Sequence, residues 1–210
     1  MDISAIRKDY TLKSLNISDV NTDPLDQFRA WFEEAVAAQV LEVNAMCIST
    51  LGLDGNPNAR IVLLKELDHG FVFFTNYESE KGQEIQQSNA GAITFFWPEL
   101  ERQVRIKGKI EKVSPEESDK YFFSRPFGSQ IGAWVSPQSR VLSSKEELSL
   151  RQIEVERKFL DEPMQRPRHW GGYRLLPHSI EFWQGRPSRL HDRVKYELKG
   201  ENWEISILAP

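Results

Sequence analysis

Close to the C-terminus, the stretch Trp183-Gln184-Gly185-Arg186-Pro187-Ser188-Arg189-Leu190-His191-Asp192-Arg193 connects two segments that have the pattern of β-strands. It leaves an apolar strand over residues 179–183, turns through Gly185 and Pro187, and enters a second strand at about Arg193. Three guanidiniums and an imidazole therefore lie beside an indole. Guanidiniums suit the oxygens of phosphates and carboxylates. The turn is either part of a site for a flat anionic ligand or a solvated hairpin tip.

The rest of the chain alternates between strand and helix patterns. Asp23-Pro24 is a helix N-cap followed by proline at the first helical position, and the apolar spacing extends this helix over residues 24–39. Ser114 with Glu117, and Ser144 with Glu147, form capping boxes that open helices over residues 114–124 and 145–160. Residues 78–88 are also compatible with a helix. Strands are predicted over residues 45–52, 58–67, 71–75, 91–97, 102–113, 172–176, 179–184, 193–198 and 203–208. Short turns between consecutive strands predict a mainly β, α+β fold: an antiparallel barrel with inserted helices.

Length and composition bound the class of protein. With 210 residues and 40% hydrophobic side chains, the chain can bury a sizeable core. Its net charge of -4 argues against a general nucleic-acid or membrane binder. The single cysteine, Cys47, leaves no intrachain disulfide, and no signal peptide or membrane-spanning apolar run is recognisable. We therefore expect a cytoplasmic protein with a mobile N-terminal arm, residues 1–21, and a single domain over residues 22–210.

Several chemistries lack their sequence motifs. The four histidines have no metal-ligand spacing, so no metal site is expected, and the chain has no phosphate-binding P-loop, no GxGxxG and no GxSxG. What remains is a set of cations, hydroxyls and amides spread over several segments: Arg60, Lys65, Lys81, Arg125, Arg186, Arg189 and Arg193, with Thr75, Gln103, Ser129, Gln138 and Ser139. A barrel could use such residues to hold a phosphorylated aromatic molecule, although charged strand faces are more often simply solvated.

Six collinear motifs carry a resemblance to a known family. They are Arg60-Ile61-Val62-Leu63-Leu64-Lys65, Leu100-Glu101-Arg102-Gln103-Val104, Tyr121-Phe122-Phe123-Ser124-Arg125-Pro126, Ser129-Gln130-Ile131-Gly132-Ala133-Trp134, Trp170-Gly171-Gly172-Tyr173-Arg174, and residues 180–193. From about Arg7 to Pro210 the chain resembles the pyridoxamine/pyridoxine 5′-phosphate oxidase family. The resemblance implies a split antiparallel β-barrel that forms a homodimer, with two FMN sites at the subunit interface.

The resemblance also implies roles for individual residues. Those expected to hold FMN are Arg60, Ile61, Val62, Leu63, Leu64, Lys65, Phe74, Thr75, Lys81, Gln103, Gln138, Ser139, Trp183 and Arg193. Those expected to bind the substrate phosphate are Lys65, Tyr121, Arg125 and Ser129. Arg189 and His191, the expected catalytic residues, would lie over the substrate's pyridine ring, and Arg7 and Tyr10 of the N-terminal arm would fold over the bound substrate.

The implied activity is the FMN-dependent oxidation of pyridoxamine or pyridoxine 5′-phosphate to pyridoxal 5′-phosphate, with O2 as electron acceptor and hydrogen peroxide as product. Two alternatives stay open. One is a split-barrel flavin oxidoreductase with another substrate, and the other is a non-catalytic protein that binds FMN or pyridoxal phosphate.

Two residues depart from the family pattern. Glu80 stands where the family usually has an arginine beside the FMN phosphate, and Phe74 stands in place of a tyrosine. A carboxylate at position 80 removes a charge-assisted hydrogen bond and adds repulsion, at a cost on the order of 1–3 kcal/mol. The sequence therefore predicts weakened FMN retention.

Overall fold

A computed structural model describes residues 1, 3–5 and 9–210. Its helices are α1 (Pro24–Ala37), α2 (Glu80–Gln87), α3 (Pro115–Ser124), α4 (Phe127–Val135) and α5 (Glu146–Asp161), with short 3-10 turns η1 (Ile17–Asp19), η2 (Pro98–Leu100) and η3 (Pro187–Arg189). Its strands are β1 (Ala45–Leu51), β2 (Pro57–Leu63), β3 (Glu66–Leu67), β4 (Phe71–Asn76), β5 (Ala90–Trp97), β6 (Arg102–Lys112), β7 (Trp170–Gln184), β8 (Asp192–Lys199) and β9 (Asn202–Ile207).

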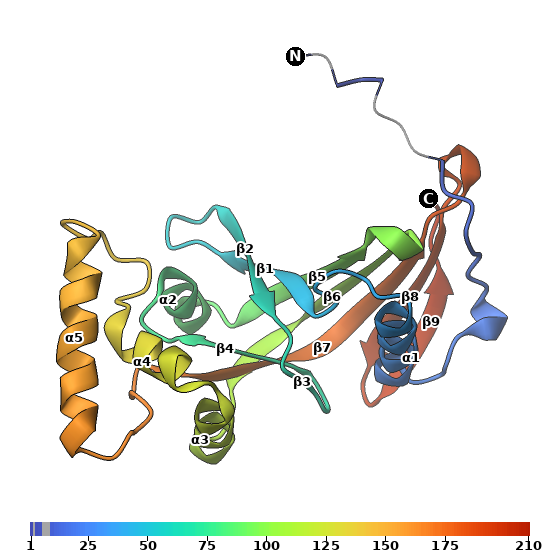
Figure 1. Ribbon diagram of the computed structural model, residues 1–210. Helices are drawn as coiled ribbons and strands as arrows, with labels where there is room; N and C mark the ends of the chain where they lie inside the picture. The colour runs from blue at the N-terminus through green and yellow to red at the C-terminus, as the bar shows by residue number, and fades with distance from the viewer. Residues whose placement is uncertain (2, 6–8) are drawn as a thin grey trace.

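The described strands form one antiparallel, curled sheet (Figure 1). Its order is β2-β1-β5-β6-β7-β4-β3, and β8 and β9 continue from β7. Helices α3, α4 and α5 lie at one end of the sheet, whereas α1, β8 and β9 lie at the other (Figure 1). The expected mixed α+β fold with an antiparallel sheet is thus confirmed.

Strand β7 is the longest strand and joins the two ends of the sheet. Along one edge it pairs with β6 from Tyr173 to Gln184. Along its other edge it pairs with β4 up to Leu175 and with β8 from Ser179 onward. Between these halves, Pro177 lies at a register shift opposite Gly108, which is a position where a strand tolerates proline. The two strands predicted over residues 172–176 and 179–184 are therefore one bulged strand.

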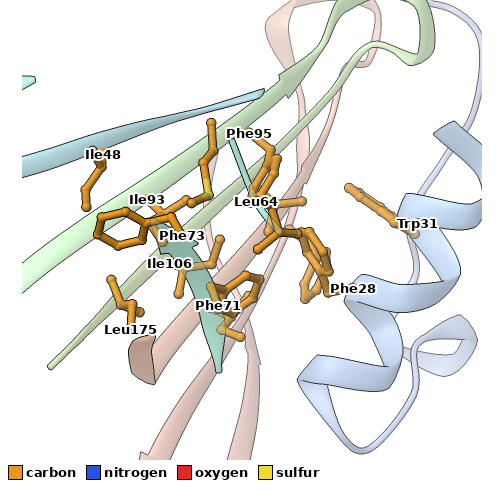
Figure 2. Close-up of a cluster of buried hydrophobic side chains, with 14 of the residues drawn as sticks. Phe28, Trp31, Ile48, Leu64, Phe71, Phe73, Ile93, Phe95, Ile106 and Leu175 are labelled. Atoms are coloured by element: carbon orange, nitrogen blue, oxygen red, sulfur yellow. The ribbon is translucent and has the colours of Figure 1, made fainter. Parts of the chain in front are cut away.

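The main core lies between α1 and the concave side of the sheet. Alternation in β6 is clean, because Val104, Ile106 and Ile110 are buried while Arg105, Lys107 and Lys109 are exposed. Helix α1 contributes Phe28 and Trp31 to this core (Figure 2). Phe28 is fully buried and contacts aromatic rings from several strands, so truncating it to alanine would cost about 3–5 kcal/mol.

Most element boundaries match the sequence prediction within two or three residues, and the differences have local causes. The strand predicted over residues 58–67 breaks after Leu63, because the Leu64 side chain turns into the core. The capping box Ser114–Glu117 is present at α3. At α5 the predicted Ser144 cap is wrong: Glu147 instead accepts hydrogen bonds from the backbone and hydroxyl of Ser143.

Helix α4 is absent from the sequence prediction. It begins directly after Pro126 and carries Gly128 and Gly132, which lower its intrinsic helix propensity. Burial of Ile131, Ala133 and Val135 supplies the stabilisation that local propensity lacks. Among the described residues, no helix combines the length and apolar character that crossing a membrane requires.

Candidate functional site

A cleft opens at the end of the sheet where α3 and α4 pack, and it has a volume of about 550 Å³. Its walls come from the end of β2, from β4, from the first turn of α2, from α3 and α4, and from the start of β7. The lining residues are Ile61, Val62, Leu63, Lys65, Phe74, Thr75, Lys81, Tyr121, Arg125, Pro126, Ser129, Gln138 and Trp170. Eleven of these thirteen are residues to which the family resemblance gave a role in binding FMN or the substrate phosphate.

The cleft concentrates positive charge. Lys81 is only 7% exposed, and its ammonium donates to the Thr75 hydroxyl at 3.0 Å. Burial, together with the charge of nearby Arg60, lowers the pKa of Lys81. Burial also lowers the pKa of Arg125, whose Nη1 is buried and has no hydrogen-bond partner within the described part of the chain. Buried cationic donors without partners are expected to bind an anion.

Aromatic rings form one wall of the cleft. Phe74 stacks on Tyr121 with centroids 4.0 Å apart and on Trp170 at 5.6 Å. The guanidinium of Arg125 lies 4.5 Å from the Trp170 ring centroid, so a cation–π contact holds it against this wall. Gly172 allows the stack to form, since a Cβ atom there would lie 2.8 Å from the Phe74 ring.

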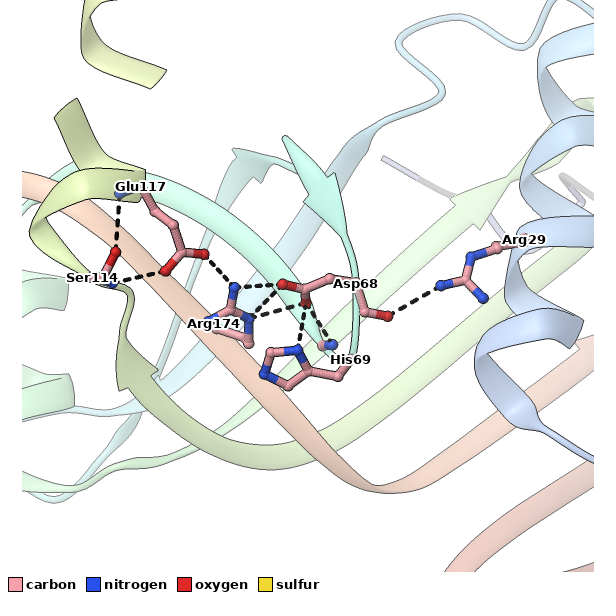
Figure 3. A network of polar contacts seen from close by, with 7 residues as sticks. Arg29, Asp68, His69, Ser114, Glu117 and Arg174 are labelled. Carbon is pink, nitrogen blue, oxygen red and sulfur yellow. Dashed lines mark hydrogen bonds and ion pairs between the residues drawn. The ribbon is translucent and has the colours of Figure 1, made fainter. Parts of the chain in front are cut away.

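A partly buried ion-pair network fixes α3, and with it Tyr121 and Arg125, to the sheet (Figure 3). Arg174 of β7 is 6% exposed and binds Asp68 through Nε and Nη2. It also donates to Glu117 at 2.6 Å, and Glu117 closes the capping box of α3. Both carboxylates have lowered pKa values: hydrogen bonds from the Ser114 backbone and Arg174 act on Glu117, and Arg174 overcomes the effect of burial on Asp68.

Two residues that line the cleft were not among the predicted site residues: Pro126 and Trp170. Both belong to motifs that carry the family resemblance, and Pro126 also sets the sharp passage from α3 to α4. Trp170 begins β7, and its position against Tyr121 depends on the packing of α3. Periodicity could identify Trp170 only as a core residue.

A second group of predicted residues lies at the far end of β7. Gln103, Trp183 and Arg193 are direct partners across β6, β7 and β8, and Phe96 of β5, which was not predicted, pairs with Gln103. The four residues form one row on the outward side of the sheet, here called the Trp183 row. The Arg193 guanidinium is held by Glu181 at 3.0 Å and by the Ala209 carbonyl at 2.7 Å.

His191 and Arg189 follow this row in the turn after β7. The imidazole lies 4.6 Å from the Trp183 ring, and its Nδ1 accepts the Arg186 backbone N–H at 3.1 Å. Burial, with a smaller contribution from the charge of Arg189, lowers the pKa of His191. Arg189 is exposed and has a positive φ of 61°. Tyr10 lies edge-on to Trp183 at 5.7 Å and near His191 at 5.9 Å; Arg7 lies outside the described residues.

Trp170 in the cleft and Trp183 in the row lie at opposite ends of β7. They are thirteen residues apart on this strand, which corresponds to about 40 Å at ~3.3 Å per residue. Exposed apolar side chains occur in both regions: Ile61 of the cleft lining is 65% exposed and Phe96 of the row is 55% exposed. Large exposed apolar residues beside polar ones are typical of an interaction surface.

The remaining predicted residues lie near the cleft without lining it. Arg60 donates to Thr50 and forms an ion pair of 2.8 Å with Glu84, which is 1% exposed. Leu64 contributes its side chain to the core, and Ser139 is exposed with a φ of 71° next to Gln138. Glu80 is the exposed first residue of α2 and faces a hollow that Glu84 also lines. No group of three or more potential metal ligands occurs among the described residues.

Known proteins with similar sequences cover the full chain. A protein of Trichormus variabilis named pyridoxine/pyridoxamine 5′-phosphate oxidase is 55% identical over 99% of this chain and 98% of its own length. A protein of the same name from Paraburkholderia phymatum is 54% identical over 99% of both chains.

Solved structures support the same fold. PhzG from Burkholderia lata 383, in complex with tetrahydrophenazine-1-carboxylic acid, has a TM-score of 0.88 and 30% identity over 95% of this chain and 99% of its own. A pyridoxamine 5′-phosphate oxidase-related, FMN-binding protein from Nostoc punctiforme has a TM-score of 0.71 and 15% identity over 87% of this chain and 97% of its own. These likenesses confirm the split-barrel fold.

Two family descriptions divide the chain between them. Residues 32–159 match pyridoxamine 5′-phosphate oxidase, and residues 170–210 match the pyridoxine 5′-phosphate oxidase C-terminal dimerisation region. The chain therefore belongs to the pyridoxamine 5′-phosphate oxidase family of flavoprotein oxidoreductases.

Proposed function

We propose that this protein oxidises pyridoxine or pyridoxamine 5′-phosphate to pyridoxal 5′-phosphate with FMN as cofactor, O2 as acceptor and hydrogen peroxide as product. One observation carries the proposal: Lys65, Tyr121, Arg125 and Ser129 converge in one cleft, and Arg125 Nη1 is buried there without a partner among the described residues. A phosphate would supply the acceptors that these donors lack.

The same cleft suits the phosphorylated cofactor. Lys65, Lys81 and Thr75 would hold the FMN phosphate, Gln138 would donate to polar atoms, and the backbone around Ile61–Leu63 would follow its chain. Bound FMN would supply the two-electron acceptor for the substrate's C4′ carbon. The protein's own part is binding and orientation: the cations hold the phosphate so that the reacting carbon has a fixed position.

A second copy of the chain would complete the site. Trp183 lies at the opposite end of β7 from Trp170 in the cleft, an extended length of about 40 Å, so a ligand bound against Trp170 would take a second aromatic wall from another chain. In a two-fold dimer, each cleft would receive the partner's Trp183, Arg193, Arg189 and His191, giving two equivalent sites. The exposed Ile61 in the cleft lining and the exposed Phe96 in the row favour this arrangement.

Within that dimer, we assign Arg189 and His191 to the substrate's ring. The lowered pKa keeps His191 neutral near pH 7, and its Nδ1 is already an acceptor for the Arg186 backbone. The neutral ring therefore presents Nε2–H as a donor toward the ligand. Arg189 contributes a permanent charge, and neither residue forms a covalent bond to the substrate.

A second candidate is oxidation of a carboxylate-bearing tricyclic compound, favoured by the likeness to PhzG. A non-catalytic FMN or pyridoxal-phosphate binder is the third candidate, and Glu80 motivates it. The number of cations in the cleft favours the first candidate over the second, because a carboxylate substrate needs fewer cations than a phosphorylated one.

The deciding experiment is the visible spectrum of FMN-loaded protein under anaerobic conditions. Pyridoxine 5′-phosphate should bleach the flavin band, and air should restore it with release of hydrogen peroxide. Pyridoxine without its phosphate is the matched control and should bleach it far more slowly. If tetrahydrophenazine-1-carboxylic acid bleaches the flavin band and pyridoxine 5′-phosphate does not, the second candidate replaces the proposal. If neither compound bleaches the band, the non-catalytic binder is favoured.

A further inference from the structure

Glu101 lies at the turn between η2 and β6 and is only 3% exposed. Its backbone has a left-handed conformation, with a φ of 55°, which glycine adopts more cheaply than glutamate. The turn is held in place because its carbonyl accepts the Gly185 backbone N–H at 2.8 Å and the Gln184 side-chain amide at 3.2 Å. A glutamate side chain at this strained position is expected to have a specific partner.

That partner is the N-terminal arm. Glu101 Oε2 accepts the backbone N–H of Thr11 at 2.8 Å and of Leu12 at 3.1 Å. Hydrogen bonds from backbone amides to a buried carboxylate are charge-assisted and strong. Both bonds are made by the arm's main chain rather than by its side chains.

The two bound amides directly follow Tyr10. The Tyr10 ring lies edge-on to Trp183 and near His191, and it packs on Gly185, where an added Cβ atom would lie 2.6 Å from the ring. Glu101 is therefore linked to Tyr10 through the arm's backbone and to Gly185 through its own carbonyl.

A second carboxylate holds the arm farther along. Asp192 Oδ2 accepts the Leu15 backbone N–H at 2.9 Å, and Arg186 Nη1 donates to the Lys13 carbonyl at 3.1 Å. This anchor lies beyond residue 12, so it fixes the arm's path without fixing Tyr10. The Glu101 bonds lie directly next to the tyrosine, at residues 11 and 12.

We propose that Glu101 is a positioning residue: its carboxylate grips the backbone of residues 11 and 12 and so holds Tyr10 against Trp183 and His191. The inference rests on the proposed function for its effect on substrate binding, because Trp183 and His191 are assigned to the site there. The grip itself is a property of the arm and is measurable without turnover.

The first test is hydrogen–deuterium exchange of the FMN-loaded protein. Glu101→Gly removes the carboxylate and relaxes the left-handed backbone, so the fold is preserved. Amides of residues 11 and 12 should exchange at least 10-fold faster than in the unchanged protein, whereas the Leu15 amide, held by Asp192, should change much less. Glu99→Gln, at an exposed position of the same turn, is the control and should leave exchange unchanged. Equal exchange at residues 11 and 12 in Glu101→Gly and the unchanged protein would overturn the grip.

The second test uses steady-state kinetics with pyridoxine 5′-phosphate. Glu101→Gly should raise KM roughly 10-fold with unaltered FMN affinity and melting temperature, and Glu101→Gln, which keeps an acceptor oxygen, should give an intermediate KM. In a Tyr10→Ala background, Glu101→Gly should add no further change, since both act through the same ring. Faster exchange with an unchanged KM, or additive effects of the two substitutions, would overturn the positioning role. If the unchanged protein shows no turnover, the proposed function is refuted. The hydrogen bonds between Glu101 and residues 11 and 12 are then tested by the exchange experiment alone.

Discussion

The cationic side chains of the cleft and of the Trp183 row differ in whether the protein itself supplies their partners. In the cleft, Arg125 Nη1 is buried without a partner in the described chain, and the Lys81 ammonium donates to the neutral hydroxyl of Thr75. In the row, Arg193 is bound by Glu181 and by a carbonyl. The cleft is therefore arranged to receive an anion, whereas the row is a preorganised wall that needs none to be satisfied.

The comparison predicts where charge removal matters most. Arg125→Met should raise KM for pyridoxine 5′-phosphate roughly 50-fold, about 2.3 kcal/mol, because a charged bond to phosphate is lost. Arg157→Met, on the exposed side of α5, should have no effect on KM. The measurement is initial rate against substrate concentration, and equal KM values for the two variants would remove Arg125 from the phosphate site.

Subunit mixing tests whether the two regions serve one site. Arg125→Met and Trp183→Ala should each be poorly active alone. After dissociation and reassociation of a 1:1 mixture, half of the dimers are hybrids with one intact site, so activity should recover to about a quarter of the unchanged protein's. If hybrid dimers are shown to form and activity does not recover, the cleft and the Trp183 row act within one chain.

Glu80 tests how the cleft's edge affects the cofactor. Glu80→Arg should tighten FMN binding roughly 10-fold, at the lower end of the expected range, because Glu80 is exposed and lies beside the cleft rather than in its lining. Titration of apoprotein with FMN by fluorescence quenching gives the two dissociation constants. Glu80→Gln is the control for removing charge without adding any. A dissociation constant that is the same in all three proteins would separate position 80 from cofactor binding.

The smallest effect concerns His191 in the row. Its pKa is below the ordinary value of 6.5 in the folded protein, so on acidification the unfolded chain takes up the proton more readily. The free energy of unfolding should therefore fall as pH drops below about 6.5 until the folded-state pKa is passed. His191→Asn, which keeps an acceptor for the Arg186 N–H but does not titrate, should lose less stability between pH 7 and pH 5. Denaturant titrations at both values measure this; parallel losses would mean that His191 does not contribute.

Sequence patterns predicted the strands and most helices because alternation in β6 and capping at α3 are local signals. They missed α4, because its two glycines lower the local helix propensity and the helix is stabilised by tertiary burial. The site was predicted through resemblance, and the structure brings Lys65, Tyr121, Arg125 and Ser129 together. What sequence could not supply is the partition between cleft and row, because it depends on how far β7 runs. The ion pair of Arg60 with Glu84 was equally hidden, since it joins β2 to α2.

Strand β7 has a consequence for how this chain is made. The C-terminal region, residues 170–210, matches a separate family description, yet its first strand lies between β6 and β4 in the middle of the sheet. During synthesis, β4 and β6 would each present an unpaired edge until the last fifth of the chain emerges. The region is thus no detachable module. A chain truncated near residue 165 would have two unpaired strand edges. We expect such a chain to aggregate or to bind chaperones rather than to fold into a smaller functional barrel.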